Sequence, residues 1–426
     1  MIVPPFIEDA LWTAARKRLP PEVCGGPALT AAVIDRSRRY TSERERLVAP
    51  STGRAAAADL AARALFFTIA DVAKPWLPLA ELADGLLPAP AGFLAGDALR
   101  VLDVGAGCGA MTIGLLAFLA RRPHRPALRL ILVDRDAGAL EIAADAIAIV
   151  ARTLELDVTV TVRCSDVDAI AQVTPRSFDL VLAGTVLNEL DGDGPRMLTA
   201  AMLAAAKPLG VVLIIEPALR QTTRALHHLR DELIADRRAT VLAPCSRRGA
   251  PCPALLDERD WCHDHRPVSL PPRTNQLAQV TGLRDGAIKL SYLALTPSFD
   301  VPVSPAVRAV SDPRAEKGKH ALMTCGRSGW VPMRLLRRHR GESNRGFERA
   351  RRGDLLLINA DRGHADASGD QPAVSPDLSG PAFAPAPLEV PRQQHGPPIT
   401  DGTAPTLVEL SETDHVELLV VDRGDG

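Results

Sequence analysis

The stretch VLDVGAGCGAMT at residues 101–112 decides the fold. Its first half is apolar, as in a buried strand, and three alternate glycines follow at Gly105, Gly107 and Gly109. Glycine has no side chain, so a backbone turn at these positions can approach a ligand closely. A helix that begins after the turn points its N-terminal amides toward the same ligand. The stretch therefore predicts a strand, a ligand-binding turn and a helix.

Short apolar runs alternate with amphipathic stretches on the C-terminal side of this motif. Strands are predicted at 99–104, 128–134, 157–163, 178–184 and 210–216. Helices are predicted between or after them at 109–122, 136–154, 194–208 and 218–238. Strands that are apolar throughout and joined by helices form a parallel sheet that is covered on both faces. The pattern predicts an α/β fold with a Rossmann-like sheet.

Acidic residues at the strand ends distinguish between two cofactors for such a sheet, since the glycine spacing alone also suits a dinucleotide. Asp103 precedes the glycines inside its strand, and Asp134 ends the next strand. This pair resembles motif I and the second-strand acid of the class I S-adenosylmethionine-dependent methyltransferases. The resemblance implies that the turn holds the methionine part, Asp134 the ribose and Asp166 the adenine. The predicted cofactor-binding residues are Asp103, Gly105, Ala106, Gly107, Gly109, Asp134, Asp166 and Asn188.

The end of the fourth predicted strand, AGTVLNELDGDG at 183–194, is where methyl-transfer chemistry is usual in that family. It contains neither the Asn/Asp-Pro-Pro-Tyr/Phe loop nor a Pro-Cys nucleophile. Asn188 and Glu189 either contact a substrate or cofactor, or cap the following helix. Because methyl transfer often needs only positioning, no catalytic residue is predicted, and both an active and an inactive protein stay open.

Three cysteines, Cys245, Cys252 and Cys262, lie within 18 residues of a Pro-rich loop, and Cys325 ends a later predicted strand. Four thiolates are the usual ligands of structural zinc and of iron–sulfur clusters. Zinc prefers closer C-x₂₋₄-C pairs, so the wide spacing favours an iron–sulfur cluster and leaves zinc as the alternative. His263 and His265 are possible further ligands.

These features together resemble the methyltransferase-like family associated with the small ribosomal subunit, known in mitochondria as assembly factors and also in bacteria. The resemblance covers roughly residues 30–355 and rests on the glycine motif, on NEL after the fourth strand, on IIEPALRQTTRALHHLRDELI and on APC…CP…DWCH. It implies a 4Fe–4S cluster on the four cysteines, S-adenosylmethionine and contact with small-subunit rRNA. The sequence departs from the family pattern at Ser246 and Arg247 after the first cysteine, and at Asp264.

Charge is distributed unevenly along the 426 residues, although the net charge is only −1. Residues 314–352 hold twelve Lys/Arg against three Asp/Glu, and residues 355–426 hold the reverse, twelve acidic against three basic. The arginine-rich part predicts phosphate contacts with rRNA. The alternative is a solvated helix face offset by the acidic tail. The arginines concerned are Arg334, Arg337, Arg338, Arg340, Arg345, Arg349, Arg351 and Arg352.

Four regions are predicted: N-terminal helices at 1–95, a Rossmann-like methyltransferase core at 96–240, a Cys-ligated insertion with the last sheet strands and the basic segment at 241–355, and a disordered acidic tail at 356–426. No run of about 20 apolar residues occurs, so we expect no membrane contact. The first residues lack a basic stretch followed by an apolar one, so no signal peptide is expected. Seven cysteines are too few for a disulfide scaffold, which predicts a cytoplasmic location. No DNA partner is expected. Three functions are open: an RNA methyltransferase, a non-catalytic assembly or translation factor and, less favoured, a small-molecule methyltransferase.

Overall fold

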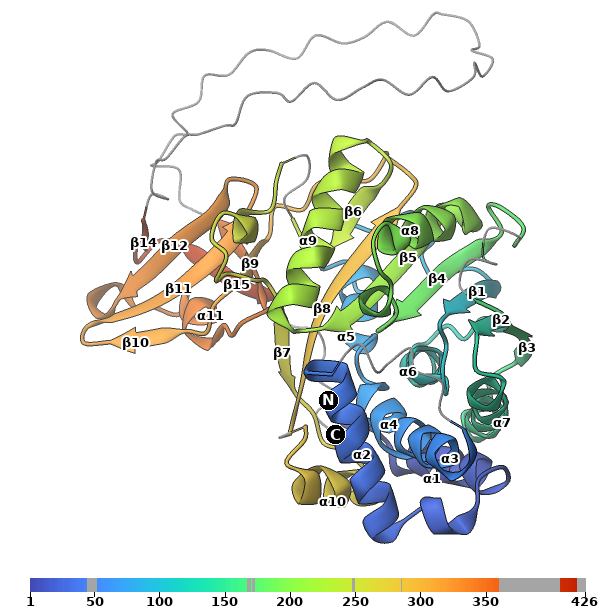
Figure 1. Cartoon of the computed structure of the whole chain (residues 1–426). Coiled ribbons are helices and arrows are strands. Elements are labelled where there is room, and N and C mark those ends of the chain that lie inside the picture. The colour runs from blue at the N-terminus through green and yellow to red at the C-terminus, as the bar shows by residue number, and fades with distance from the viewer. Residues whose placement is uncertain are drawn as a thin grey trace, which may run out of the picture.

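The computed structural model describes residues 1–43, 52–166, 170, 173–246, 250–284, 286–359 and 407–419. Its main feature is a mixed sheet in the order β3-β2-β1-β4-β5-β8-β6, with β7 paired to β8 (Figure 1). The strands are β1 (Ala98–Val104), β2 (Ala127–Asp134), β3 (Val158–Cys164), β4 (Phe178–Gly184), β5 (Ala206–Pro217), β6 (Thr240–Ala243), β7 (Asp264–Pro267) and β8 (Ala287–Thr296).

The five strands predicted from the apolar runs are confirmed, and they are mutually parallel. β8 is antiparallel to both β5 and β6, which makes the sheet mixed. The inner strands are buried on both faces because they are apolar throughout. Their carboxyl ends therefore meet at one edge, where ligands bind in open α/β sheets.

Helices cover the two faces in separate layers (Figure 1). One core contains α6 (Ala110–Leu119) and α7 (Ala137–Thr153) together with the N-terminal helices. The other contains α8 (Gly194–Ala205) and α9 (Arg220–Ala235). The N-terminal helices are α1 (Pro5–Arg16), α2 (Gly26–Thr41), α3 (Gly53–Ala62), α4 (Thr68–Asp71) and α5 (Trp76–Ala83), and α10 (Pro272–Thr281) contacts α1 and α2.

Within the predicted helical region 1–95, the chain between α3 and α4 forms a π-helical turn at Arg63–Phe67. Such turns insert one extra residue per turn and often mark functional positions. Arg63 begins the turn, and its side chain leaves the helix toward the sheet. Periodicity in an Ala-rich stretch does not reveal such an insertion.

A second sheet, ordered β14-β12-β11-β9-β13-β15 with β10 paired to β11, follows the first. Its strands are β9 (Val307–Ala309), β10 (Arg314–Glu316), β11 (Lys319–Gly326), β12 (Gly329–Leu336), β13 (Leu355–Asn359), β14 (Val408–Leu410) and β15 (His415–Leu419). β14 and β15 lie at opposite edges, yet only residues 411–414 separate them. Six flat strands would span about 24 Å, more than this linker reaches at about 18 Å, so the sheet is curled.

The expectation of a disordered tail over 356–426 is wrong for two parts of it. Residues 355–359 form β13, and 407–419 supply β14 and β15. Leu410 and Val416 are buried in the core of the second sheet, which explains why this acidic segment is folded. Residues 360–406 and 420–426 lie outside the described part of the chain.

Residues 241–355, predicted to hold a Cys-ligated insertion, the last sheet strands and the basic segment, contribute strands to both sheets. β6, β7 and β8 extend the main sheet, and β9 to β13 form most of the second. The basic segment is mainly strand β12, a 3₁₀ turn at Arg337–His339 and the short α11 (Arg345–Arg349), and not one long helix face. None of the helices in the described part of the chain is long and apolar enough to cross a membrane.

Candidate functional site

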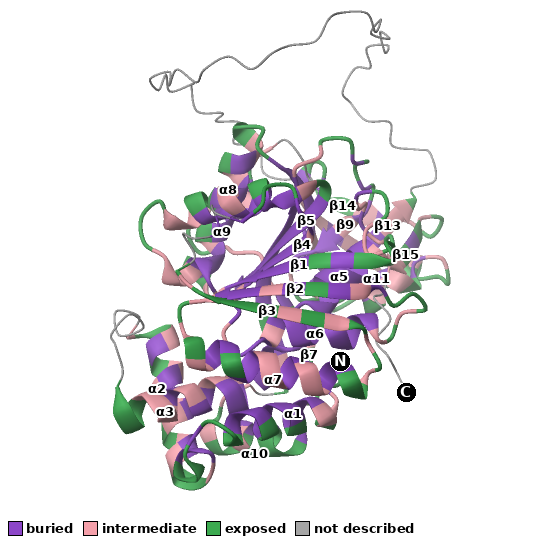
Figure 2. Cartoon of the chain, turned by 90° about the vertical axis from the view of Figure 1, so that its right-hand side faces the viewer, coloured by how far each residue is buried: buried purple, intermediate pink, exposed green. Residues whose placement is uncertain are grey.

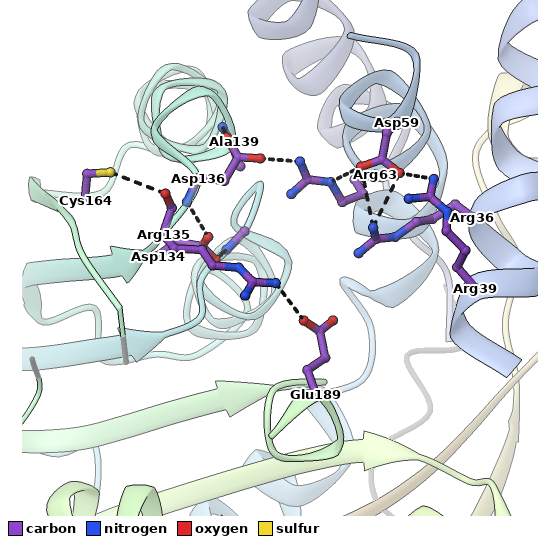
Figure 3. Close-up of polar contacts among 11 residues, drawn as sticks. Arg36, Arg39, Asp59, Arg63, Asp134, Arg135, Asp136, Ala139, Cys164 and Glu189 are labelled. Atoms are coloured by element: carbon purple, nitrogen blue, oxygen red, sulfur yellow. Dashed lines mark hydrogen bonds and ion pairs between the residues drawn. The ribbon is translucent and has the colours of Figure 1, made fainter. Parts of the chain in front are cut away.

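A cavity of about 1080 Å³ opens at the carboxyl ends of β1, β2 and β4, beneath the N-terminal helices. Figure 3 shows part of its polar lining, with the arginines of α2 and of the π-helical turn after α3 on one side and the ends of the strands on the other. Its volume is at the upper end of the range for ligand sites, about 300–1,000 Å³. The cavity therefore has room for a nucleoside-sized ligand and part of a second molecule.

The glycine turn and Asp134 form one wall of this cavity. Gly107 N–H donates to Asp134 Oδ2 at 2.8 Å, and Asp136 N–H donates to Asp134 Oδ1 at 2.9 Å. Gly105 and Gly107 have φ values of +63° and +52°, which favour glycine. A Cβ on Gly107 would meet nothing within 4 Å, so the space above it is open.

Six of the eight predicted cofactor residues line the cavity, namely Gly105, Ala106, Gly107, Asp134, Asp166 and Asn188. Asp103 lies below the turn, where its Oδ2 accepts from Thr112 Oγ1 at 2.6 Å. Burial raises the pKa of Asp103 to about 7, and its Oδ1 has no partner among the described residues. Gly109 instead lets α6 approach α7, because a Cβ there would meet Ala143 at 3.2 Å.

A buried carboxyl group accepts hydrogen bonds from the loop after β4 and fixes its position. Glu216, at the end of β5, accepts from Leu187 N–H at 2.9 Å and from Asn188 Nδ2 at 2.7 Å. Burial raises the pKa of Glu216 to about 7, although these hydrogen bonds oppose the shift. The loop also touches the glycine turn, since a Cβ on Gly105 would lie 2.4 Å from a methyl group of Val186.

Glu189 points into the cavity from the same loop (Figure 3). Its Oε2 lies 3.8 Å from Arg135 Nη2. Burial raises the pKa of Glu189, and the nearby charges of Arg36 and Arg135 act against that rise. A carboxylate and a guanidinium therefore face the interior of the cavity.

The N-terminal helices contribute a cluster of arginines that sequence analysis did not identify. Arg36 Nη1 and Arg63 Nε donate to Asp59 at 3.4 Å and 3.1 Å, and Arg39 pairs with the same carboxylate. Arg63 also pairs with Asp136, the residue that caps α7 (Figure 3). Arg63 thus joins the helices above the cavity to the strand edge below it. The only sequence signal was the spacing of Arg36 and Arg39 on one helix face.

The four predicted metal ligands lie near one another. Burial raises the pKa of the Cys262 thiol, and the thiols of Cys245, Cys325 and Cys252 raise it further. Burial raises the pKa of Cys252 to about 12. Among the described residues, however, no group of three or more His, Cys, Asp or Glu side chains has the arrangement that holds a metal ion.

Neighbouring side chains hold the cysteine backbone in place. Cys252 N–H donates to Asp231 Oδ2 at 2.8 Å, and Cys262 N–H donates to His227 Nε2 at 3.1 Å, both partners belonging to α9. Arg224, also on α9, donates from Nη1 to three carbonyl oxygens of the loop, those of Ala254, Asp257 and Asp260. The loop with Cys252 and Cys262 is therefore fixed to the helix that follows β5.

The arginines of the basic segment divide into paired and unpaired groups. Arg334 pairs with Glu409 of β14, Arg340 with Glu348 at 2.8 Å and Arg352 with Asp312 at 3.4 Å. Five others are exposed and have no ion pair within the described ranges: Arg337, Arg338, Arg345, Arg349 and Arg351. Of these, Arg338 donates from Nε to His339 Nε2 at 3.1 Å. Arg334, which was predicted to contact phosphate, is therefore paired with Glu409 of the acidic C-terminal segment.

Comparison with protein families matches residues 97–357, more than half of the chain, to the model described as "Mitochondrial small ribosomal subunit Rsm22". The chain belongs to the Rsm22 family. The Rsm22 match includes the glycine turn, the loop after β4 and all four cysteines. It does not include α2 and the π-helical turn after α3, which supply the arginines above the cavity, or the C-terminal strands β14 and β15.

Solved structures similar to this Rsm22-family chain include S-adenosylmethionine-dependent methyltransferases. A magnesium protoporphyrin IX methyltransferase from Synechocystis, with bound S-adenosylmethionine, is 13% identical over 64% of this chain and 99% of that chain, with a TM-score of 0.32. A TehB-like methyltransferase from Corynebacterium glutamicum is 15% identical over 63% and 98%, with a TM-score of 0.30. No curated protein matches. The cytoplasmic location expected from the sequence stays a prediction, since the Rsm22 description names mitochondria.

Proposed function

We propose that this protein binds S-adenosylmethionine in the cavity at the strand ends and acts on the RNA of the small ribosomal subunit, with an iron–sulfur cluster on its four cysteines. The observation that carries the proposal is the pairing of Gly107 N–H with the Asp134 carboxylate at the wall of a large cavity. The family description supplies the small ribosomal subunit.

The residues around the glycine turn fit S-adenosylmethionine. Each Asp134 oxygen accepts one backbone N–H and keeps a lone pair for a ribose hydroxyl. The open space over Gly107 admits the methionine part. Asp166 also lines the cavity, and we assign it to the adenine. When bound, the cofactor supplies an electrophilic methyl group, and the task of the protein is to orient an acceptor toward it.

A non-catalytic factor is the second candidate, and the loop after β4 favours it. Asn188 donates to Glu216, and Glu189 faces Arg135 at 3.8 Å, so both side chains have a partner inside the protein. In this alternative, the cofactor stabilises the fold, and RNA binding alone carries the function.

The cysteine site fits a cluster better than a single zinc ion. The thiols of Cys245, Cys252 and Cys325 raise the pKa of Cys262, so the four lie close enough to interact electrostatically. Their wide spacing in the sequence favours a cluster, since zinc prefers C-x₂₋₄-C pairs. Trp261 Nε1 and His263 Nδ1, on either side of Cys262, are buried without hydrogen-bond partners in the described structure. Both are suitable donors to cluster sulfur atoms.

RNA binding would use the unpaired arginines of the second sheet. Arg337, Arg345, Arg349 and Arg351 are exposed and carry no partner in the described ranges, so each is available to a phosphate. The mixed charge of the cavity, where Arg36, Arg39 and Arg63 share Asp59, makes that surface less suited to a nucleic-acid backbone.

Two measurements test the proposal. Calorimetry with anaerobically purified protein should show binding of S-adenosylmethionine, and absence of binding at millimolar ligand would remove the cofactor from the proposal. Co-sedimentation should show the protein with small ribosomal subunits, and its absence would contradict a ribosomal role. Methylation profiling of small-subunit rRNA in a deletion strain then separates the two candidates. If the protein is an enzyme, the rRNA of the deletion strain lacks a methyl group that the wild-type rRNA carries.

A further inference from the structure

The outer edge of β3 is the most exposed strand edge of the main sheet. β3 pairs only with β2 among the described strands, and most of its residues are exposed (Figure 2). Residues 158–164 read VTVTVRC and contain no proline or lysine. Native proteins usually protect such an edge with these residues, because its free backbone groups pair readily with another chain.

The backbone hydrogen bonds define which residues face this free edge. Asp157 C=O accepts from Leu128 N–H at 2.7 Å, and Ser165 N–H donates to Asp134 C=O at 2.9 Å. The β2–β3 register between these two bonds has no bulge. Because backbone groups alternate between the two sides of a strand, the odd-numbered residues bond to β2. The even-numbered residues therefore present their N–H and C=O groups to the free edge: Val158, Val160, Val162 and Cys164.

We propose that this edge pairs with the same edge of a second copy, antiparallel and with Val160 on the two-fold axis. An antiparallel pair centred on Val160 aligns even-numbered residues with even-numbered ones, so the free backbone groups meet as hydrogen-bonded pairs. A two-fold axis makes every such contact occur twice. The edge is self-complementary in this register on both of its faces.

On one face, the side chains that meet are apolar. Val160 lies opposite Val160 of the partner subunit, and Val162 lies opposite the partner's Val158. Val162 is 43% exposed, so this pairing would bury a large apolar side chain that the single chain leaves in water. Val158 and Val160 already pack partly against the core on the same face as α7.

On the other face, the side chains that meet are polar and of opposite charge. Asp157 lies opposite the partner's Arg163, and Thr159 lies opposite the partner's Thr161. Opposite charges and Thr–Thr pairs stabilise antiparallel neighbours. Centring the pair on Thr161 instead places Asp157 opposite the partner's Ser165 and loses both ion pairs. The charges therefore favour the register centred on Val160 over this neighbouring one.

The dimer would place the two cavities far apart on one continuous sheet. Asp166, which lines the cavity, lies just beyond the carboxyl end of β3. In an antiparallel pair these ends point in opposite directions, so the cavities open at opposite ends of the shared sheet. One strand edge is a small interface, and the dimer should dissociate on dilution.

Light scattering coupled to size-exclusion chromatography of the full chain tests the proposal. The wild-type protein should show a concentration-dependent dimer. Arg163→Asp alone, or Asp157→Arg alone, should raise the dimer dissociation constant about tenfold, since each puts like charges opposite each other at two places. The double variant Asp157→Arg/Arg163→Asp should restore dimerisation. Asp157 also pairs with Arg129 within the chain, but that pair is lost equally in the single Asp157 variant and in the double variant.

Val160→Pro provides a test that does not depend on charge. It removes an N–H that faces the free edge and leaves the bonds to β2 intact, as edge strands tolerate. The variant should be monomeric with an unchanged circular dichroism spectrum. A wild-type protein that is monomeric at every concentration would overturn the proposal, as would a dimer that Val160→Pro leaves intact. Dissociation by Val160→Pro without any effect of the charge reversals would overturn the register.

Discussion

Arg308 donates from Nη1 and Nη2 to the two carboxylate oxygens of Glu81, at 2.8 Å each. Both side chains are almost completely buried, and the residues are 227 positions apart. Glu81 belongs to α5 in the N-terminal region, and Arg308 to β9 in the second sheet. Arg308 Nε also donates to Pro244 C=O at 2.8 Å, next to Cys245. One guanidinium therefore connects the helices, the cysteine loop and the second sheet.

Breaking this pair should strongly destabilise the protein. Glu81→Gln or Arg308→Met leaves an uncompensated buried charge or polar group, and we expect a loss of about 3–5 kcal/mol in the free energy of unfolding. Urea denaturation measures it. Arg259→Met, which removes an exposed partner of Asp257, is the control and should change stability little. A small loss at Glu81 would mean that water reaches the pair.

The buried carboxyl of Glu216 predicts a pH dependence. Its pKa in the folded protein is raised to about 7 from an ordinary value of 4.5. Between these values the folded state holds a proton that the unfolded state has lost. Glu216 therefore contributes stability that is complete below pH 4.5 and is lost as the pH rises through 7, up to about 3 kcal/mol. Urea denaturation between pH 4.5 and 8 should show a steeper loss of stability in wild type than in Glu216→Gln, and the difference between the two is the contribution of Glu216, because Asp103 titrates in both proteins.

Gly105 should tolerate no side chain. Gly105→Ala places a Cβ in a left-handed conformation and 2.4 Å from a methyl group of Val186, so the turn and the loop after β4 must separate. We expect calorimetric binding of S-adenosylmethionine to be lost, by at least about tenfold in affinity. Gly192→Ala is the matched control, because Gly192 has a similar φ of +55° but open space around it. Equal effects of both variants would argue against the contact with Val186.

Four of the seven cysteines should be required for binding the metal cluster. Protein purified without oxygen should contain about four irons and four sulfides per chain. Cys245→Ser, Cys252→Ser, Cys262→Ser and Cys325→Ser should each reduce the iron content and the visible absorbance. Cys24, Cys108 and Cys164 lie elsewhere in the fold, and their serine variants are the controls. One zinc per chain and no iron would show that the four cysteines bind zinc instead of a cluster. Absence of any metal would contradict both assignments.

The unpaired arginines should dominate RNA affinity. The triple variant Arg337→Glu/Arg345→Glu/Arg349→Glu should weaken binding to small-subunit rRNA and reduce its salt dependence, by about 0.7–0.9 in the log–log slope for each lost phosphate contact. The control variant Arg38→Glu/Arg152→Glu/Arg196→Glu changes net charge equally at exposed positions elsewhere. If both variants weaken binding equally, the effect is one of overall charge and not of this surface.

Two features of the main sheet could be predicted because they are local. Five buried strands follow from apolar runs, and the turn after β1 follows from Gly105 and Gly107, which have the positive φ that their residue type permits. Six of the predicted cofactor residues line one cavity because the carboxyl ends of parallel strands meet at one edge. Asp134 was identified for the same reason, since it ends the second strand.

The amino-acid sequence by itself determined the alternation of strands and helices, the glycine turn and the types of side chain available for chemistry, because these depend on residues close in the chain. Only the tertiary structure decided which charges meet. Arg63 pairs with Asp136, and Arg308 pairs with Glu81. Glu409 pairs with Arg334, which had been predicted to contact RNA. Periodicity reports which face of an element is buried, but the partner of a buried charge is set by packing between segments distant in sequence.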